Sequence, residues 1–217
     1  AWESLTGTHA RLGRVQGEAG RYYEEVAPFA AVPDGASSSC WADLAALFDP
    51  AAQVVLVDPP GGTPGDWTLA WQVEGFQLTG ENLAAEPDAD AVTLGPADVP
   101  AMLDLIARTQ PGPFRPRTIE LGRYLGLRAG GELVAMAGER MRPPGWTEIS
   151  AVCTDERFRG RGFAARLVRA VSHGIRARGE LPFLHASAQN TNAIRLYESL
   201  GFEIRRPCVF TGWQLPA

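Results

Sequence analysis

The chain has 217 residues, of which 45% are hydrophobic and 21% charged, and its formal net charge at pH 7 is −5. This composition is typical of a globular protein with a substantial core, built as one large domain or two small ones. It excludes a membrane-spanning helix, because no apolar run approaches about 20 residues, and it gives no reason to expect a nucleic-acid partner.

Charge is unevenly distributed along the chain. Acidic residues outnumber arginines two to one in residues 1–150, and arginines outnumber acidic residues two to one in residues 151–217. A polyanionic ligand is therefore expected to bind the C-terminal third. There is no lysine, and either phosphate recognition by arginine or the codon preference of a GC-rich genome explains that absence equally well.

The three cysteines, Cys40, Cys153 and Cys208, are odd in number, far apart and without the spacing of a metal site. The first residues lack the basic-then-apolar layout of a signal peptide. We therefore expect a cytoplasmic protein that binds no metal.

Residues 1–87 are predicted to form a smaller α/β unit without a catalytic motif. The elements expected there are a short helix over 41–48, a buried strand over 54–57 and a half-buried strand over 67–73. If Trp67 and Trp71 were exposed instead of packed, they would mark a surface for a partner or for dimerisation. The acidic stretch 81–90 carries too little apolar surface to pack and is the predicted boundary.

Residues 88–217 are predicted to form a second domain. A proline-dense loop, 110–117, follows its first helix, and the glycines of 129–132 suit a tight hairpin turn. The last strand is expected beside the strand that precedes it. The predicted elements are strand 91–94, helix 98–106, strands 123–128, 133–140 and 148–153, helix 163–175, strand 182–186, helix 190–200 and strand 208–213.

The segment Arg157-x-x-Gly160-x-Gly162 is predicted to bind an anion. Glycine lets a ligand approach the backbone closely, and the unpaired N–H groups at the start of the following helix point outward. The same glycines also fit a dinucleotide fingerprint with Glu180 as its acidic residue. That interpretation is disfavoured, because six residues separate the preceding strand from Gly160 and because Glu180 comes before the next strand rather than at its end.

This loop resembles the pyrophosphate loop of the GNAT superfamily of acetyl-CoA-dependent N-acyltransferases. A second segment, from Asn190 through Ala193 and Tyr197 to Gly201-Phe202, resembles the other signature of that family. The resemblance implies a mixed, mostly antiparallel sheet flanked by helices. It also suggests that the N-terminal unit is a degenerate acyltransferase-like half.

The resemblance further implies that acetyl-CoA is the co-substrate. Its diphosphate would lie on the backbone amides of the loop, and its pantetheine arm would pair with a strand that splays from its neighbour. The implied cofactor-binding residues are Val152, Cys153, Thr154, Arg157, Arg159, Gly160, Arg161, Gly162, Phe163, Ala164, Asn190 and Ala193.

Two residues are candidates for the chemistry. Tyr197 is expected to protonate the departing thiolate, or else to anchor its helix as a packed aromatic. Glu148 is expected to act as general base, with Ser150 and Val152 on the same strand face, or else to be a solvent-facing carboxylate. His185 is expected to be a core or cleft histidine.

Other residues carry two interpretations. Asn190 contacts the cofactor, caps the helix, or does both. Cys153 is expected to be a small core residue rather than a nucleophile, since an amine can attack the thioester directly.

The expected reaction is transfer of an acetyl group from acetyl-CoA to a primary amine of a small molecule or peptide. The alternative is an acyl-CoA-binding sensor or interaction module that has lost turnover. An open acceptor cleft in which a carboxylate or an ordered water faces the thioester would favour the enzyme. We expect a monomer or homodimer.

Overall fold

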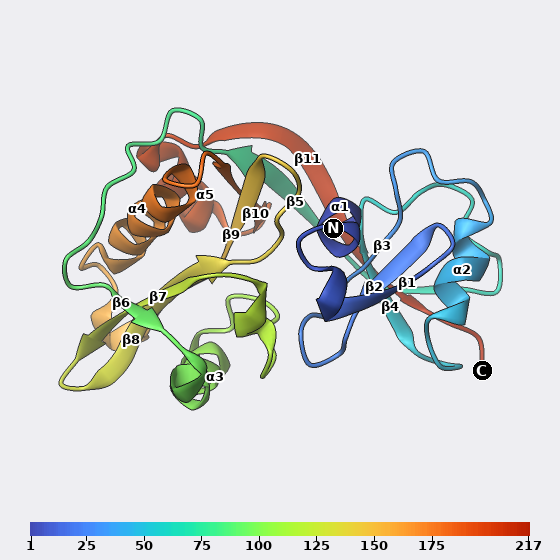
Figure 1. The fold of residues 1–217 in the computed structure, drawn as a ribbon, viewed down its shortest axis with the longest axis horizontal. Coiled ribbons are helices and arrows are strands. Elements are labelled where there is room, and N and C mark those ends of the chain that lie inside the picture. The colour runs from blue at the N-terminus through green and yellow to red at the C-terminus, as the bar shows by residue number, and fades with distance from the viewer.

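The computed structural model describes residues 1–217 as two lobes (Figure 1). Two long strands, β5 (Thr68–Thr79) and β11 (Glu203–Gln214), run from one lobe into the other. The other strands are β1 (Gly13–Gln16), β2 (Ala19–Tyr22), β3 (Ala30–Ala31), β4 (Gln53–Val57), β6 (Val92–Leu94), β7 (Tyr124–Ala129), β8 (Glu132–Glu139), β9 (Trp146–Thr154) and β10 (Leu181–Ser187). The α-helices are α1 (Trp2–Thr6), α2 (Cys40–Ala46), α3 (Val99–Thr109), α4 (Phe163–Arg176) and α5 (Thr191–Leu200). Short 3₁₀ turns are η1 (Ala10–Leu12), η2 (Pro96–Asp98), η3 (Thr118–Leu121) and η4 (Glu156–Phe158).

Eight strands form one mixed sheet in the order β4-β11-β5-β10-β9-β8-β7-β6. Every neighbouring pair is antiparallel except β9 and β10, which are parallel. The hairpin of β7 and β8 turns at Gly130 and Gly131, which both have positive φ, as a tight turn requires. This architecture confirms the expected mixed, mostly antiparallel sheet with flanking helices.

Helices cover both faces of the sheet. The apolar face of α4 buries Leu167, Val171 and Ile175 in one core cluster, together with α5 residues and Ala135 of β8. On the opposite face, α3 packs in a second cluster that contains Met136 of β8. The alternation of β8 side chains between the two clusters follows from the two-residue period of a strand.

The parallel strands β9 and β10 separate partway along their length. Their pairing ends at Leu184 opposite Ile149, and beyond that point β9 pairs only with β8. Ala151, with φ of +53°, interrupts the register between β8 and β9 as a bulge. A bulge moves the following side chains to the other face, so the expectation that Val152 shares a face with Glu148 is wrong. Val152 instead packs toward α4.

The prediction that the final strand lies beside the strand that precedes it in the chain is wrong. β5 lies between β10 and β11, and β11 pairs with β5 along nearly its whole length. β11 also begins earlier than predicted and includes Pro207, which lies opposite Phe76. Local sequence patterns carry no signal for a pairing between strands so far apart in the chain.

Residue 87 is not a break in the structure. β4 and β5 belong to the same sheet as the strands that follow residue 87. A core cluster also joins Leu5, Tyr22 and Phe29 to Met141 and Phe183. The N-terminal residues therefore pack directly on the C-terminal part, and the suggestion that they descend from a degenerate acyltransferase-like half stays a prediction.

The strand 67–73 differs from the expected half-buried alternation. Trp67 is buried against Trp41, with ring centroids 5.3 Å apart, whereas Trp71 is 36% exposed and Val73 37%. β10 accompanies β5 only as far as Gly75, so β11 alone lies beside residues 68–73. The structure has no helix long and apolar enough to cross a bilayer.

Candidate functional site

A cleft of about 1210 Å³ opens where β9 and β10 separate. Its lining brings together the Gly160 loop, the N-terminal turn of α5 and the end of β9 from the C-terminal part. Phe29 and β5 from the N-terminal part complete it, with the proline-dense loop after α3. Both sequence signatures therefore face one cavity. No Asp or Glu lines it.

The glycine loop has free main-chain donors. Gly160 and Gly162 both have φ of +76°, and a Cβ on either would meet nothing within 4 Å. The first main-chain bond of α4 runs from the N–H of Arg166 to the carbonyl of Gly162, and no N–H group of residues 160–165 bonds within the protein. This cluster of donors at the start of a helix suits a phosphate-sized anion.

The three loop arginines have different surroundings. Arg157 is bonded to Asp155, its Nε 3.0 Å from Oδ1, and also pairs with Glu132, so its side chain lies outside the cleft lining. Arg159 lines the cleft and pairs with Glu156 at 3.1 Å. Arg161 has no ion-pair partner, and its guanidinium lies 4.9 Å from the centre of the Phe158 ring. Arg157 thus braces the loop, whereas Arg159 and Arg161 remain available to an anion.

The end of β9 offers main-chain groups to the cleft. Residues 150–154 pair with β8 on one side and have no strand partner on the side of β10. Thr154 lines the cleft with a buried hydroxyl that lacks a hydrogen-bond partner. Cys153 is buried among α3 residues, and this burial raises the pKa of its thiol. These surroundings suit the small core residue expected at this position.

Asn190 caps α5, since its Oδ1 accepts a hydrogen bond from the N–H of Ala193 at 3.1 Å. Both residues also line the cleft, so the cap and a contact with a ligand are compatible. At the other end of the helix, Gly201 has φ of +98° and forms the expected left-handed stop.

Tyr197 combines packing with access to the cleft. Its ring meets Phe202 edge-on at 5.9 Å and the residue is 8% exposed, yet it belongs to the cleft lining. No hydrogen bond within the protein engages its hydroxyl, and burial raises the pKa of the phenol to about 12. The hydroxyl is therefore protonated at neutral pH and can act as a proton donor.

Glu148 is not a solvent-facing carboxylate, because it is only 1% exposed. Arg140 binds both of its oxygens, with Nε to Oε2 at 2.8 Å and Nη2 to Oε1 at 2.6 Å. Burial alone would raise the pKa of this carboxyl, but the charge and hydrogen bonds of Arg140 outweigh burial and hold the pKa far below its usual range. Such a carboxylate is a weak base, and it does not line the cleft.

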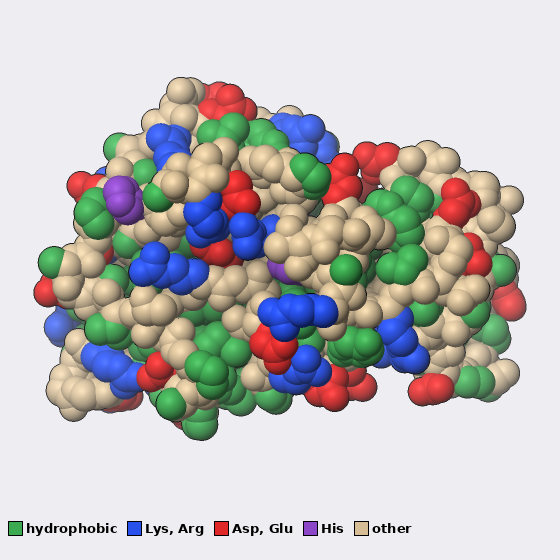
Figure 2. Space-filling view, viewed as in Figure 1, with side chains coloured by type: hydrophobic (Ala, Val, Ile, Leu, Met, Phe, Trp, Pro, Cys, Tyr) green, Lys and Arg blue, Asp and Glu red, His purple; other side chains and the backbone are tan.

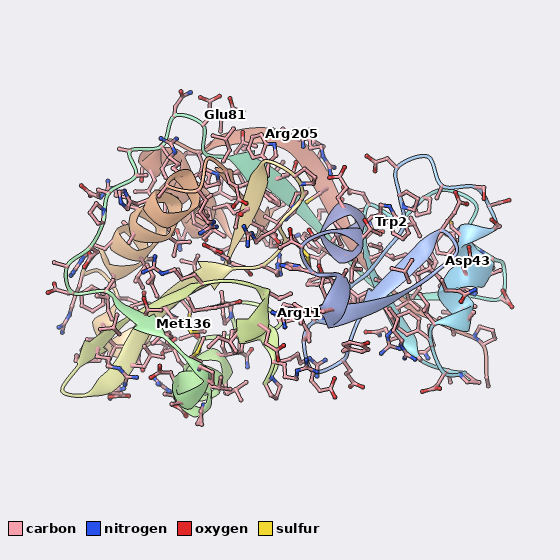
Figure 3. All side chains as sticks on the ribbon, in the orientation of Figure 1. Trp2, Arg11, Asp43, Glu81, Met136 and Arg205 are labelled. Atoms are coloured by element: carbon pink, nitrogen blue, oxygen red, sulfur yellow. The ribbon has the colours of Figure 1, made fainter.

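His185 lies between Glu148 and the cleft. Its Nδ1 is 2.6 Å from Oε1 of Glu148, and its Nε2 is 3.2 Å from Nε2 of Gln77. Arg205, which β11 places beside β5 (Figure 3), donates to Oε1 of Gln77, so the Gln77 amide nitrogen faces the histidine. His185 thus donates from Nδ1 and accepts at Nε2. It is a cleft histidine, as the sequence allowed, oriented by a buried carboxylate.

Several cleft residues were not predicted from the sequence. Trp71, Val73 and Phe210 form an apolar wall, and Phe29 covers Arg140, whose guanidinium is 4.9 Å from the ring centre. The only related prediction was that Trp71, if exposed, would mark a surface for a partner. Charged side chains of both signs are interspersed over the outer surface in view (Figure 2), whereas this wall is uncharged.

Residues 124–211 match the family described as FR47-like protein. A putative acetyltransferase from the GNAT family of Novosphingobium aromaticivorans has a similar structure with a TM-score of 0.89, at 39% identity over 100% of this chain and 96% of that chain. Its likeness extends over both lobes.

Two curated relatives match shorter segments. N-alpha-acetyltransferase RimI of Mycobacterium tuberculosis is 37% identical over 83 residues, which are 37% of this chain and 51% of the relative. Mycothiol acetyltransferase of Corynebacterium glutamicum is 37% identical over 76 residues, which are 35% of this chain and 26% of the relative. The chain thus spans about half of the first relative and a quarter of the second.

Proposed function

The chain belongs to the GNAT family of acetyltransferases, and from this premise we propose that it transfers an acetyl group from acetyl-CoA to a primary amine. The observation that carries the proposal is the single cleft that joins the free N–H groups of residues 160–165 to Tyr197 and His185. It offers an anion site, a proton donor and a proton acceptor, which are the three groups the reaction needs.

Acetyl-CoA binding is assigned to the main chain of the loop and of β9. The diphosphate would lie on the free N–H groups that begin α4, near Arg159 and Arg161. The pantetheine arm would follow the unpaired side of residues 150–154, where its amides can take the place of a neighbouring strand. Asn190 and Ala193 border the same space.

The amine attacks the thioester carbonyl directly. A bond forms between nitrogen and the acetyl carbon, the carbon–sulfur bond then breaks, and the sulfur leaves with the electron pair. Tyr197 gives its phenolic proton to that sulfur, which completes CoA as a thiol. No covalent intermediate with the protein is required.

We assign proton acceptance to His185 rather than to Glu148. The acceptor ammonium first gives one proton to Nε2, where it replaces the hydrogen bond from Gln77, and the neutral amine then attacks. The second proton that nitrogen loses as the amide forms returns to the phenolate of Tyr197. Glu148 keeps Nδ1–H in place and stabilises the resulting imidazolium, while Arg140 holds Glu148. The carboxylate therefore acts on the reaction through the histidine.

The alternative is a non-catalytic acyl-CoA sensor, because no carboxylate lines this cleft and Glu148 lines the neighbouring cavity that shares His185. A thiol-release assay with acetyl-CoA and a panel of amines, amino acids and peptides separates the two. CoA release that requires an amine supports the enzyme. Calorimetric binding of acetyl-CoA without release for any acceptor would support the sensor.

The names of the curated relatives point to different acceptors, an N-alpha amine for one and mycothiol for the other. They leave the acceptor of this chain undecided. We also propose that the protein works in the cytoplasm, supported by Cys40, Cys153 and Cys208, which are buried and unpaired. The monomer or homodimer stays a prediction.

A further inference from the structure

The apolar wall formed by Trp71, Val73 and Phe210 provides a platform on which an acceptor could rest. Its outer end is Trp71 of β5, whose side chain is held in one position. The indole of Trp71 lies over Gly212 of β11, where an added Cβ would come within 2.2 Å of it. The indole N–H donates to Oε1 of Gln53 at 3.1 Å. This tryptophan is exposed, yet its ring is fixed against the sheet by a glycine and a hydrogen bond.

The platform continues toward the proposed reaction centre. Val73 lies opposite Phe210, and the Phe210 ring meets His185 edge-on at 5.6 Å. Trp71, Val73 and Phe210 all line the cleft that contains His185. An apolar path therefore leads from the proton acceptor to the indole.

The length of the path from His185 to Trp71 favours an elongated acceptor. Ser187, where β10 ends, lies opposite Gly75 of β5. Trp71 is four residues from Gly75, which corresponds to about 13 Å at the rise of a strand. An extended peptide covers that length with about four residues. A short amine bound at His185 reaches Phe210 but not the indole of Trp71.

The edge of β5 beside the platform has no strand partner. The N–H of Ala188 bonds to the carbonyl of Glu74 at 2.9 Å, so the main chain of Glu74 faces the β10 side. By the two-residue period, the N–H and C=O of Gln72 face the same side, where β10 has already ended. A peptide main chain can pair with these groups as an added strand.

From these relationships we propose that the acceptor is the amino terminus of an extended peptide. Its main chain pairs with β5 near Gln72, and uncharged, apolar side chains at its second and fourth positions rest on Val73 and Trp71. Side chains two apart lie on the same face of a strand, which gives this spacing. The acidic groups near His185 line the second cavity, and none lines the cleft beside Trp71 to attract a cationic side chain. This inference rests on the proposed acetyl transfer.

The test compares acceptors that share an N-terminal alanine and differ in their side chains or in their length. Ala-Val-Gly-Trp-Gly amide, Ala-Ser-Gly-Ser-Gly amide and alaninamide are assayed with acetyl-CoA and the full chain. We expect kcat/KM to be about 10- to 100-fold higher for the first peptide than for the other two, the ratio typical of burying one large apolar side chain. N-methylation of single backbone amides of that peptide should lower kcat/KM without changing its side chains.

Two variants test the platform. Trp71→Ala removes the indole, and Gly212→Ala displaces it while retaining it. Both should reduce the preference for the apolar peptide over alaninamide by about tenfold or more. Ile204→Ala, which shortens an exposed side chain of β11 outside the cleft, is the matched control and should leave the preference unchanged.

Equal efficiency for alaninamide and the apolar peptide, or no effect of N-methylation, would overturn the inference while the acetyl-transfer function stands. Failure to acetylate every peptide also overturns it. If calorimetry then shows no binding of acetyl-CoA, the proposed function fails with it.

Discussion

Oε1 of Glu148 lies 2.6 Å from Nδ1 of His185, so a buried carboxylate fixes a ring that lines the cleft and whose other nitrogen accepts from Gln77. The first prediction follows from this pair. His185→Gln should lower kcat by about 100-fold or more, because a glutamine cannot accept the proton of the ammonium. Steady-state kinetics with saturating acetyl-CoA measures the loss.

Comparing two amine acceptors shows whether His185 accepts a proton or only has a structural role. An amine that is already uncharged at the assay pH does not have to give up a proton before it attacks, so the variant should lose less activity with it than with a strongly basic amine. The same loss with both amines would contradict a base at position 185.

The ion pair of Arg140 and Glu148 gives a second prediction, about stability. Glu148→Gln leaves the nearly buried guanidinium of Arg140 without its countercharge, which is expected to cost about 3–5 kcal/mol of unfolding free energy. Urea denaturation at pH 7 measures it. Because the folded-state pKa of Glu148 is lowered, the contribution of the pair is complete above the usual carboxyl pKa and is lost as the pH falls below it.

The double variant Arg140→Met with Glu148→Leu is the control for this charge effect. It removes both charges together, and it should be more stable than Glu148→Gln alone. If Glu148→Gln were as stable as the unmodified chain, the ion pair would contribute little to stability and an unpaired Arg140 would not be costly.

Gly162 and Gly145 allow a matched test of the anion site. Their φ values are +76° and +77°, and a Cβ on either meets nothing within 4 Å. Alanine should therefore cost each site about 1–2 kcal/mol of stability for the left-handed conformation. Only Gly162→Ala should weaken acetyl-CoA binding, by about tenfold, because only Gly162 begins α4 beside the free N–H groups.

Calorimetric titration with acetyl-CoA distinguishes the two glycine variants. Similar losses of affinity in both would show that destabilisation, rather than the geometry of the loop, sets the binding.

The local part of the fold and site was predictable from the sequence. The helix that begins at Phe163, the capped helix after Asn190 and the glycine turn at 130–131 each have a pattern of neighbouring residues that sets them. The expectation that the glycine loop at 160–162 and Tyr197 face the same ligand agrees with their place in the lining of one cavity.

The features of the fold and site that the sequence did not predict depend on contacts between residues far apart in the chain. The insertion of β5 between β10 and β11 leaves no local pattern, and neither does the wall formed by Trp71. The bulge at Ala151 occurs at a residue that rarely has positive φ, so sequence reasoning assigned Val152 to the wrong face. The pairing of Arg140 with Glu148 links β9 to the residue that follows β8 and was not predicted, and for this reason we propose that Glu148 positions His185 instead of acting as the base.

His9 gives a prediction on the pH dependence of stability. It is buried between the hydroxyl of Tyr22 and the carbonyl of Leu121, and burial lowers its pKa to about 4. Between pH 4 and 6.5 the unfolded chain binds a proton that the folded chain does not, so stability should fall as the pH falls through this range. The loss is on the order of 1 kcal/mol between pH 6.5 and 5 after solvent screening.

His9→Gln should flatten this dependence in urea denaturation, and His173→Gln, at an exposed position of α4, should not. An unchanged slope in His9→Gln would assign the acid sensitivity to other groups.

The last prediction concerns Tyr197, which lines the cleft while its ring packs on Phe202. Tyr197→Phe keeps the ring and removes the proton donor, so it should lower kcat by about 10²- to 10⁴-fold with little change in the Kd of acetyl-CoA. An acyl donor whose thiol leaving group is more acidic needs less protonation, and the variant should lose less activity with it. Equal losses in kcat and in acetyl-CoA affinity would mean that the ring holds α5 in place and that another group protonates the sulfur.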